Sequence, residues 1–318
     1  MVHVSKKTIK GKKYTYLVKS IRLPDGSIKK ISKIIDKSTS KKILEKKYLN
    51  DFLNKEKEAN IKWALRNFEK NSVMAEEEIK KVESIRVDYK YLLKKLTNEQ
   101  KKDVFDRFIV NFTYESNALE GNSLTLKDVA IVIFDKKYSK NKDLREIYET
   151  RNSRNVLDIL LKKKFKINHE SIIKMHKMLM KDIDTRSGYK KIPNFLLGKR
   201  LQTTPPEKVY SEMTDLLDWY NKNSNKIHPI TTASIFHAKF EKIHPFEDGN
   251  GRVGRFLVNT ILVNNGYPPL MVRKTSRNAY FTCLEAADNG HYKKMERFLL
   301  EKFKKTYNNF FEIYTKYI

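Results

Sequence analysis

Residues 244–255 read His-Pro-Phe-Glu-Asp-Gly-Asn-Gly-Arg-Val-Gly-Arg, and three of the ten glycines of this 318-residue chain lie within six residues of this stretch. Apolar residues at helical spacing stop before His244 and resume at Phe256. The stretch is therefore predicted to be a tight loop that runs directly onto the N-terminus of a helix. Backbone N–H groups and the positive end of the helix dipole bind anions at such a place. Gly249 and Gly251 allow the backbone to approach a phosphate closely.

The charged side chains of this loop suit the same ligand. Arg252 and Arg255 are three residues apart, on one face of the first helical turn. Both cations are Arg in a chain with 14 arginines and 52 lysines, and a planar guanidinium matches phosphate oxygens better than an ammonium does. Asp248 is a hard carboxylate suited to Mg²⁺, and His244 can carry a proton near neutral pH. Together these residues indicate phosphoryl or nucleotidyl transfer.

Other phosphate and metal motifs do not fit the loop. No Gly-Lys-Ser/Thr follows it, so it is not a Walker loop, and a helix rather than a strand precedes it, so it is not a Rossmann fingerprint. His237 and His244 are seven residues apart, with no carboxylate partner at the spacing of a zinc motif. We expect His237 to be a core or capping histidine.

The loop resembles the Fic-domain motif His-x-Phe-x-(Asp/Glu)-Gly-Asn-Gly-Arg-x-x-Arg at every specified position. The likeness extends over about residues 105–305, and Gly188 to Pro206 is similar to the β-hairpin flap of that family. The first hundred residues show no such resemblance. The resemblance implies a Fic-type helical bundle with a short β-hairpin flap.

Fic proteins transfer AMP from ATP to a hydroxyl of a target protein, so the resemblance implies an Mg²⁺-dependent protein adenylyltransferase. His244 would deprotonate a Ser, Thr or Tyr hydroxyl, which would attack the α-phosphate as pyrophosphate leaves. Asp248 would hold Mg²⁺ between the α- and β-phosphates, and Arg252 would bind the β-phosphate. The remaining nucleotide-binding residues that the resemblance implies are Leu197, Gly198, Gly249, Asn250, Gly251, Gly254, Arg255, Tyr280 and Phe281. The flap at residues 189–202, around Phe195 to Lys199, would align the target chain by strand addition.

A second motif lies upstream. Ser116-Asn-Ala-Leu-Glu-Gly121 matches the Fic inhibitory pattern (Ser/Thr)-x-x-x-Glu-(Gly/Asn), and its helix is expected at about residues 105–121. The resemblance implies that Glu120 pairs with Arg255, the γ-phosphate arginine, and inhibits transfer. In some relatives the same glutamate orients water to remove AMP from the target, so de-AMPylation is an alternative. A simpler alternative is an ordinary helix that ends at Gly121.

The whole chain is expected to be mainly α. It has only 10 Gly and 8 Pro, and 33% of its residues are charged, a composition that favours helices over a many-stranded sandwich or barrel. We expect a basic N-terminal region at residues 1–95, with a β-hairpin of strands 14–18 and 28–35 followed by helices, and a Fic domain at 96–318. Helices are predicted from Thr97 through Phe112, with Thr97 and Gln100 at the cap, and then at 125–135, 143–162, 169–181, 206–222, 229–243, 250–265, 275–288 and 291–316.

Charge and cysteine content limit the partners and the compartment. Cys283 is the only cysteine, which excludes an intramolecular disulfide and fits a reducing cytoplasm. The N-terminal residues lack the apolar core of a signal peptide, and the apolar runs are too short to span a membrane. The net charge is +28, and residues 1–35 carry ten Lys or Arg and one Asp, so nucleic acid is an alternative partner and a nucleic-acid-binding regulator an alternative function. We favour instead a small ribbon packed on the following helices, and the sequence leaves a homodimer open.

Overall fold

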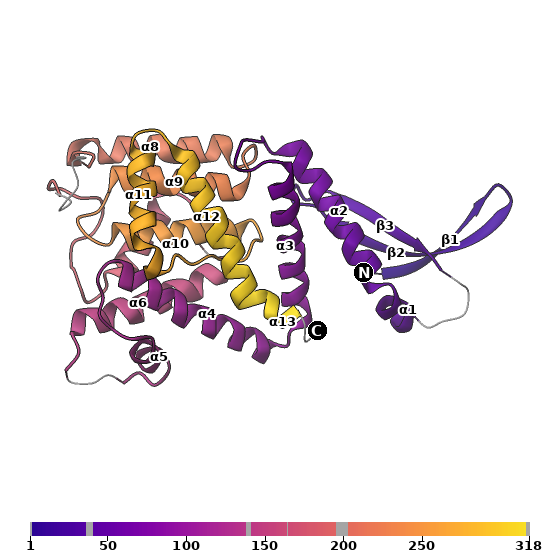
Figure 1. Cartoon of the computed structure of the whole chain (residues 1–318), viewed down its shortest axis with the longest axis horizontal. Helices are drawn as coiled ribbons and strands as arrows, with labels where there is room; N and C mark the ends of the chain where they lie inside the picture. Colours follow the sequence, from indigo (N-terminus) through magenta and orange to yellow (C-terminus); the bar gives the residue numbers. More distant parts are fainter. Residues whose placement is uncertain (1, 36–40, 138–140, 164, 195–202, 316–318) are drawn as a thin grey trace. The chain divides into compact units, whose positions relative to one another are not determined.

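The computed structural model describes residues 2–35, 41–137, 141–163, 165–194 and 203–315. The chain divides into two compact units, Met1–Asp88 and Tyr89–Ile318. The division falls inside the long helix α3 (Glu76–Lys95). Figure 1 shows a mainly helical chain with one small sheet near the N-terminus, as the composition predicts.

The first unit contains a three-stranded antiparallel sheet in the order β1-β2-β3. Its strands are β1 (Val2–Ile9), β2 (Lys12–Arg22) and β3 (Ile28–Ile34). The predicted hairpin corresponds to β2 and β3. Strand β1 is not predicted, because after Val4 it carries mainly Lys, Ser and Thr and lacks the apolar alternation that marks a half-buried strand.

One face of this sheet is packed against helices of its own unit. Helices α1 (Lys41–Lys47) and α2 (Leu49–Asn67) follow the sheet. The buried core joins side chains of the strands and helices: Leu17, Ile21, Ile31, Ile35, Leu44, Phe52 and Ala59. Residues of a strand that are an even number apart share a face, so Leu17 and Ile21, four apart in β2, point into this core together.

The second unit is a bundle of helices, and its predicted positions are confirmed to within a few residues. Its helices are α4 (Asn98–Leu119), α5 (Leu126–Phe134), α6 (Leu144–Leu161), α7 (His169–Leu179), α8 (Pro206–Asn223), α9 (Pro229–Ile243), α10 (Asn250–Asn264), the 3₁₀ turn η1 (Lys274–Ser276), α11 (Arg277–Asp288), α12 (Tyr292–Tyr307), the π-helical turn η2 (Asn308–Glu312) and α13 (Ile313–Thr315). Thr97 and Gln100 form the predicted capping box at the start of α4, with the side chain of each accepting from the backbone N–H of the other.

Helix α10 lies at the centre of this bundle. It packs against α9, α6, α7 and α4, and its residues from Arg252 to Val263 are all buried. A helix that is buried on every side fixes the loop at its N-terminus in place. That loop consists of residues 244–249 and contains the first half of the motif.

The predicted flap is described only in part. Gly188 to Asn194 and Thr203 onward contain no strand before α8 begins at Pro206. Residues 195–202, which include Leu197 and Gly198, lie outside the described residues, so the β-hairpin and its contacts stay a prediction. In the portion of the chain that is described, no helix has the length and apolar character needed to cross a membrane.

Candidate active site

The loop between α9 and α10 is held in an unusual backbone conformation. His244 ends α9 in the left-handed region, at φ 51° and ψ 61°, and its N–H donates to Phe240 O at 2.9 Å. A non-glycine residue in this region is strained by about 1–2 kcal/mol, and such strain clusters at functional sites. Gly249 also has a positive φ of 77° and immediately precedes α10, so this position requires glycine.

Two side chains hold the loop from inside. Phe246 is fully buried and stacks on the ring of His176 from α7, with centroids 3.8 Å apart. The amide of Asn250 brackets the backbone of Phe246: Oδ1 accepts from its N–H at 2.8 Å and Nδ2 donates to its carbonyl at 2.7 Å. His176 Nε2 donates to Asp248 O at 3.1 Å. The side chain of Asn250 is therefore engaged in shaping the loop, and only its backbone N–H lies at the helix N-terminus.

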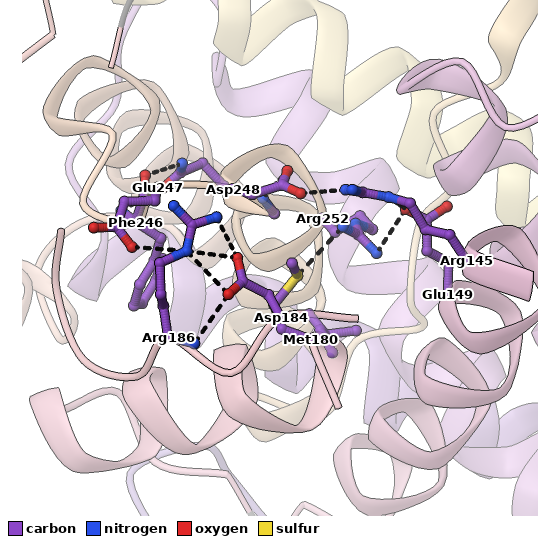
Figure 2. Close-up of polar contacts among 12 residues, drawn as sticks. Arg145, Glu149, Met180, Asp184, Arg186, Phe246, Glu247, Asp248 and Arg252 are labelled. Carbon is purple, nitrogen blue, oxygen red and sulfur yellow. Dashed lines mark hydrogen bonds and ion pairs between the residues drawn. The ribbon is translucent and has the colours of Figure 1, made fainter. Parts of the chain in front are cut away.

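Arg252 is buried beneath the loop without a complete set of partners. It is 2% exposed, its Nη2 lies 3.4 Å from Met180 Sδ, and its Nη1 lies 3.4 Å from Glu149 Oε1. Its Nε has no hydrogen-bond partner among the residues that are described. Figure 2 shows the guanidinium between these side chains. A buried cationic N–H without an acceptor is costly, and an anionic oxygen would satisfy it.

Asp248 is an ionised carboxylate that faces two arginines. Its Oδ2 pairs with Arg145 of α6, as Figure 2 shows, and its Oδ1 accepts from Gly249 N at 2.6 Å. Burial alone would raise the pKa of Asp248, but the charge of Arg252, the Gly249 N–H and Arg145 together hold that pKa below its ordinary value. The carboxylate is therefore charged at neutral pH and pairs with Arg145 in this structure.

Helix α4 reaches Arg255 through the upstream motif. Arg255 Nε donates to Ser116 Oγ at 3.0 Å and Nη2 donates to Ser116 O at 2.8 Å. Its Nη1 lies 2.7 Å from Glu120 Oε1. Burial would lower the pKa of Arg255, but the Glu120 carboxylate outweighs burial and the pKa lies above its ordinary value. The two motifs, more than a hundred residues apart in sequence, thus meet at one guanidinium.

Glu120 lies directly above the start of α10. A Cβ added to Gly251 would come within 2.1 Å of Glu120 Oε1, so the carboxylate rests against the backbone of the first helical turn. Gly121 follows with a φ of 100°, which ends α4 and lets the chain turn away. The carboxylate therefore occupies the anion-attracting end of α10.

The residues around Gly254 form a tightly packed support for Arg255. A Cβ on Gly254 would meet Glu241 Oε1 at 2.4 Å and the ring of His237 at 2.8 Å. His237 is buried as expected, and burial lowers its pKa to about 3. Its Nε2 hydrogen-bonds the hydroxyl of Tyr280 at 2.7 Å, and burial raises the pKa of Tyr280. Gly254 and Tyr280 thus lie within the buried layer beside Arg255.

Helix α11 contacts the end of α4. Arg277 Nε donates to Leu119 O at 3.1 Å, and its guanidinium lies 4.9 Å from the centroid of the Phe281 ring. The half-buried Phe281 is thereby connected to the helix that carries Glu120. A cation that donates to the last carbonyls of a helix stabilises that end, so α11 helps to fix the position of Glu120.

A buried lysine joins the loop to the segment that precedes α8. Lys190 is 3% exposed, its N–H donates to Pro245 O at 2.8 Å, and its Nζ donates to Asn194 Oδ1 at 2.7 Å and to Thr203 Oγ1 at 3.0 Å. Asn194 Nδ2 in turn donates to Phe246 O at 2.9 Å. Burial lowers the pKa of Lys190 to about 8. Lys190 therefore links Asn194 to Thr203, the described residues on either side of 195–202, and Lys190 and Asn194 connect this segment to the loop.

Several of these contacts could not be found from the sequence. Arg145, Glu149, His176 and Lys190 come from three separate segments, and none belongs to a motif. Arg145 carries a weak signal, since arginine is scarce in this lysine-rich chain. Glu247, which the motif leaves unspecified, accepts from Lys191 N at 3.3 Å and pairs with Arg186 at 3.4 Å, whereas Asp248 pairs with Arg145.

Comparison with known proteins supports this architecture. The model of the Fic/DOC family matches residues 166–262. The protein adenylyltransferase fic-1 of Caenorhabditis elegans is 30% identical over 195 residues, which cover 59% of this chain and 38% of that protein. The protein adenylyltransferase Fic of Nematostella vectensis is 30% identical over 192 residues, covering 58% and 45%. The chain thus spans less than half the length of these curated relatives.

Solved structures share the fold. A Fic domain containing signaling protein from Bacteroides thetaiotaomicron superposes with a TM-score of 0.65 at 26% identity, covering 71% of this chain and 93% of that chain. A Fic family protein from Desulfovibrio desulfuricans gives 0.61 at 25% identity, covering 79% and 77%. The motif at 244–255, the helical bundle around it and the family match lead to one conclusion: residues 166–262 match the Fic/DOC family, and the chain shares the fold of solved Fic proteins.

Proposed function

We propose that this protein transfers AMP from ATP to a Ser, Thr or Tyr hydroxyl of a target protein, and that Glu120 restrains this activity. The observation that carries the proposal is the contact between Glu120 and Arg255 above Gly251. A carboxylate occupies the position at a helix N-terminus where a phosphate would bind. The similarity to proteins named protein adenylyltransferase supports the reaction type.

The phosphates of ATP fit the groups that the loop leaves unsatisfied. The backbone at Gly249, Asn250 and Gly251 opens α10, where N–H groups lack intrahelical partners. Arg252 adds a buried guanidinium with an Nε that has no acceptor within the described part of the chain. The N-terminus of α10 and the Arg252 side chain together thus offer positive charge and N–H donors without acceptors, and an anionic ligand would stabilise both.

Magnesium fits the carboxylate of Asp248. Among the described residues no cluster of three or more His, Cys, Asp and Glu side chains could hold a metal ion by itself. Mg²⁺ is commonly held by one or two carboxylates together with substrate phosphates, and Asp248 is ionised with 39% of its side chain exposed. Bound there with ATP, the ion would neutralise phosphate charge. Arg145 must then release Asp248, because the same oxygen cannot serve both partners fully.

His244 is the proposed general base. It accepts the proton of the target hydroxyl, the hydroxyl oxygen bonds to the α-phosphorus, and the bond to the bridging oxygen of pyrophosphate breaks. The buried stack of Phe246 on His176 and the clamp by Asn250 hold the loop backbone, so His244 keeps its position during the reaction. Proton transfer by a positioned side chain contributes roughly 10²–10⁴ in rate.

Restraint follows from competition for Arg255. While Glu120 pairs with it, the guanidinium cannot bind the γ-phosphate, and the α-phosphorus is not held in line with the hydroxyl. Tyr280 and Phe281 remain the proposed contacts of the nucleoside, and residues 189–202 remain the proposed docking segment for the target protein. The hydrogen bonds from Lys190 Nζ to Asn194 and Thr203 hold the described residues on either side of 195–202 together, which supports this docking role.

The decisive experiment is transfer of labelled AMP. The purified chain and its Glu120→Gly variant are incubated with labelled ATP, Mg²⁺ and a cell lysate, and modified peptides are identified by mass spectrometry. Transfer of AMP that requires His244 supports the proposal, and transfer of another group from ATP refutes it. If Glu120 instead serves removal of AMP, wild-type protein releases AMP from a pre-modified target and Glu120→Gly loses that release.

A further inference from the structure

We propose that the tip of the β1–β2 hairpin, residues 6–13, is a basic ribbon that binds the phosphate backbone of double-stranded DNA. The ribbon lies entirely within the first compact unit, and its proposed role is independent of AMP transfer.

The basic ribbon extends beyond the core of its unit. All eight residues from Lys6 to Lys13 are exposed. They pair only with one another and with the next residues of β2, and β3 begins its pairing at Tyr16. The tip turns at Lys10 and Gly11, with φ of 48° and 76°, which suits the twist of a two-residue hairpin. The ribbon is thus a regular two-stranded element without a packed face.

Its charge is of one sign. Five of the eight residues are lysine, and residues 1–24 contain no Asp or Glu. Within the described residues, none of these five lysines has a carboxylate within ion-pair distance. The single acidic residue of the sheet, Asp25, is engaged by Ser27 and by Trp63 Nε1 at 2.9 Å.

The base of the same sheet is organised differently. Lys19 pairs with Glu56 at 2.6 Å, and Lys33 pairs with Asp51 at 2.9 Å, both on α2. Lysines where the sheet packs on α2 are therefore neutralised, whereas lysines at the tip are not. A negatively charged partner would stabilise the tip, because a two-stranded hairpin is marginally stable in water and its lysines repel one another.

The shape and composition of the ribbon favour duplex DNA over other polyanions. The major groove of B-DNA admits a two-stranded ribbon, whereas that of A-form RNA is too narrow. Ammonium groups suit phosphates as point charges. An anionic membrane is less fitting, since Ile9, 47% exposed, is the only apolar side chain between Lys6 and Lys13.

The test compares two fourfold lysine-to-alanine variants of the whole chain in binding to a labelled 20-base-pair duplex over a series of salt concentrations. The ribbon variant changes Lys6, Lys7, Lys12 and Lys13, and the control variant changes four exposed lysines of the second unit, Lys136, Lys137, Lys293 and Lys294. Both variants lose the same net charge of four. Each lysine on a phosphate contributes about 0.9 to the slope of log affinity against log salt concentration. We expect the ribbon variant to lose about 3.6 units of slope, if all four lysines contact phosphates, and the control to lose less than one.

Equal losses in the two variants, or no salt-dependent binding by the wild-type chain, would overturn the proposal. Tighter binding to duplex RNA or to vesicles of anionic lipid than to duplex DNA would overturn the choice of partner. A third variant carries arginine at the same four ribbon positions, so it changes the same side chains but keeps their positive charge. It should bind DNA as the wild type does, which would show that the loss in the alanine variant comes from charge and not from misfolding. AMP transfer by the ribbon variant should be unchanged, so the outcome stands apart from that of the proposed function.

Discussion

Replacing Glu120 by glycine should release the transfer activity. The substitution removes the carboxylate that lies 2.7 Å from Arg255 Nη1 and covers the backbone at Gly251. Arg255 keeps its two hydrogen bonds to Ser116, so its position is preserved. The position of Glu120 at the C-terminal cap of α4 tolerates glycine, and the next residue already has the left-handed conformation.

The size of the effect follows from the burial of the pair. The side chain of Arg255 is 4% exposed and that of Glu120 is 39% exposed. A charge-assisted hydrogen bond contributes about 1.5–3 kcal/mol, and the exposure of Glu120 reduces this to roughly 1–2 kcal/mol. ATP must overcome that free energy to reach Arg255. Removing it should raise AMP transfer roughly 5- to 30-fold.

The assay measures initial rates of self-modification with labelled ATP below saturation, with wild type, Glu120→Gly and Glu120→Gln compared at equal concentration. Glutamine keeps the shape but not the charge, so its rate should lie between the other two. Arg255→Ala in the Glu120→Gly background should lower the rate again, because the arginine that was released is then missing. If folded Glu120→Gly transfers AMP at the wild-type rate, α4 does not restrain the site and the reasoning is wrong.

Four further predictions concern the loop and its supports. His244→Ala should reduce AMP transfer by about 10²–10⁴ while ATP still binds in a calorimetric titration; substantial transfer would exclude His244 as the base. Asp248→Ala should abolish most activity together with the Mg²⁺ dependence, whereas Glu247→Ala should retain both, and equal damage would contradict the assignment of the metal ligand. Arg145→Gln should lower the Mg²⁺ concentration for half-maximal activity about two- to fivefold, since it frees Asp248 from an exposed ion pair; a higher requirement would contradict this. The pKa of Lys190 is lowered to about 8, so the folded chain binds fewer protons than the unfolded chain between pH 8 and the ordinary lysine pKa near 10.4. The free energy of unfolding should therefore rise over that window by about 2–3 kcal/mol more in the wild type than in Lys190→Met, and parallel curves in chemical denaturation would contradict it.

The sequence by itself determined the helices and the loop because their signals are local. Apolar spacing marks α9 and α10, and the capping box at Thr97 is complete within four residues. The motif at 244–255 is contiguous, so its glycines, arginines and Asp248 could be named without any knowledge of distant contacts. Strand β1 escaped prediction because it has little apolar alternation, and a neighbouring strand rather than a buried face holds it.

Tertiary structure decided which groups meet the loop. Arg145 pairs with Asp248 across 103 positions of the sequence, and Arg255 reaches Ser116 across 139. Such pairs depend on how α4 and α6 pack around α10. Apolar spacing in a single sequence marks the buried face of each helix but not which helix packs against it. The burial of Lys190 is of the same kind: an abundant, normally exposed residue type becomes a clasp only because the loop and the segment before α8 close over it. Local interactions are encoded in neighbouring residues, whereas the charge balance of the site depends on burial, which the folded chain alone defines.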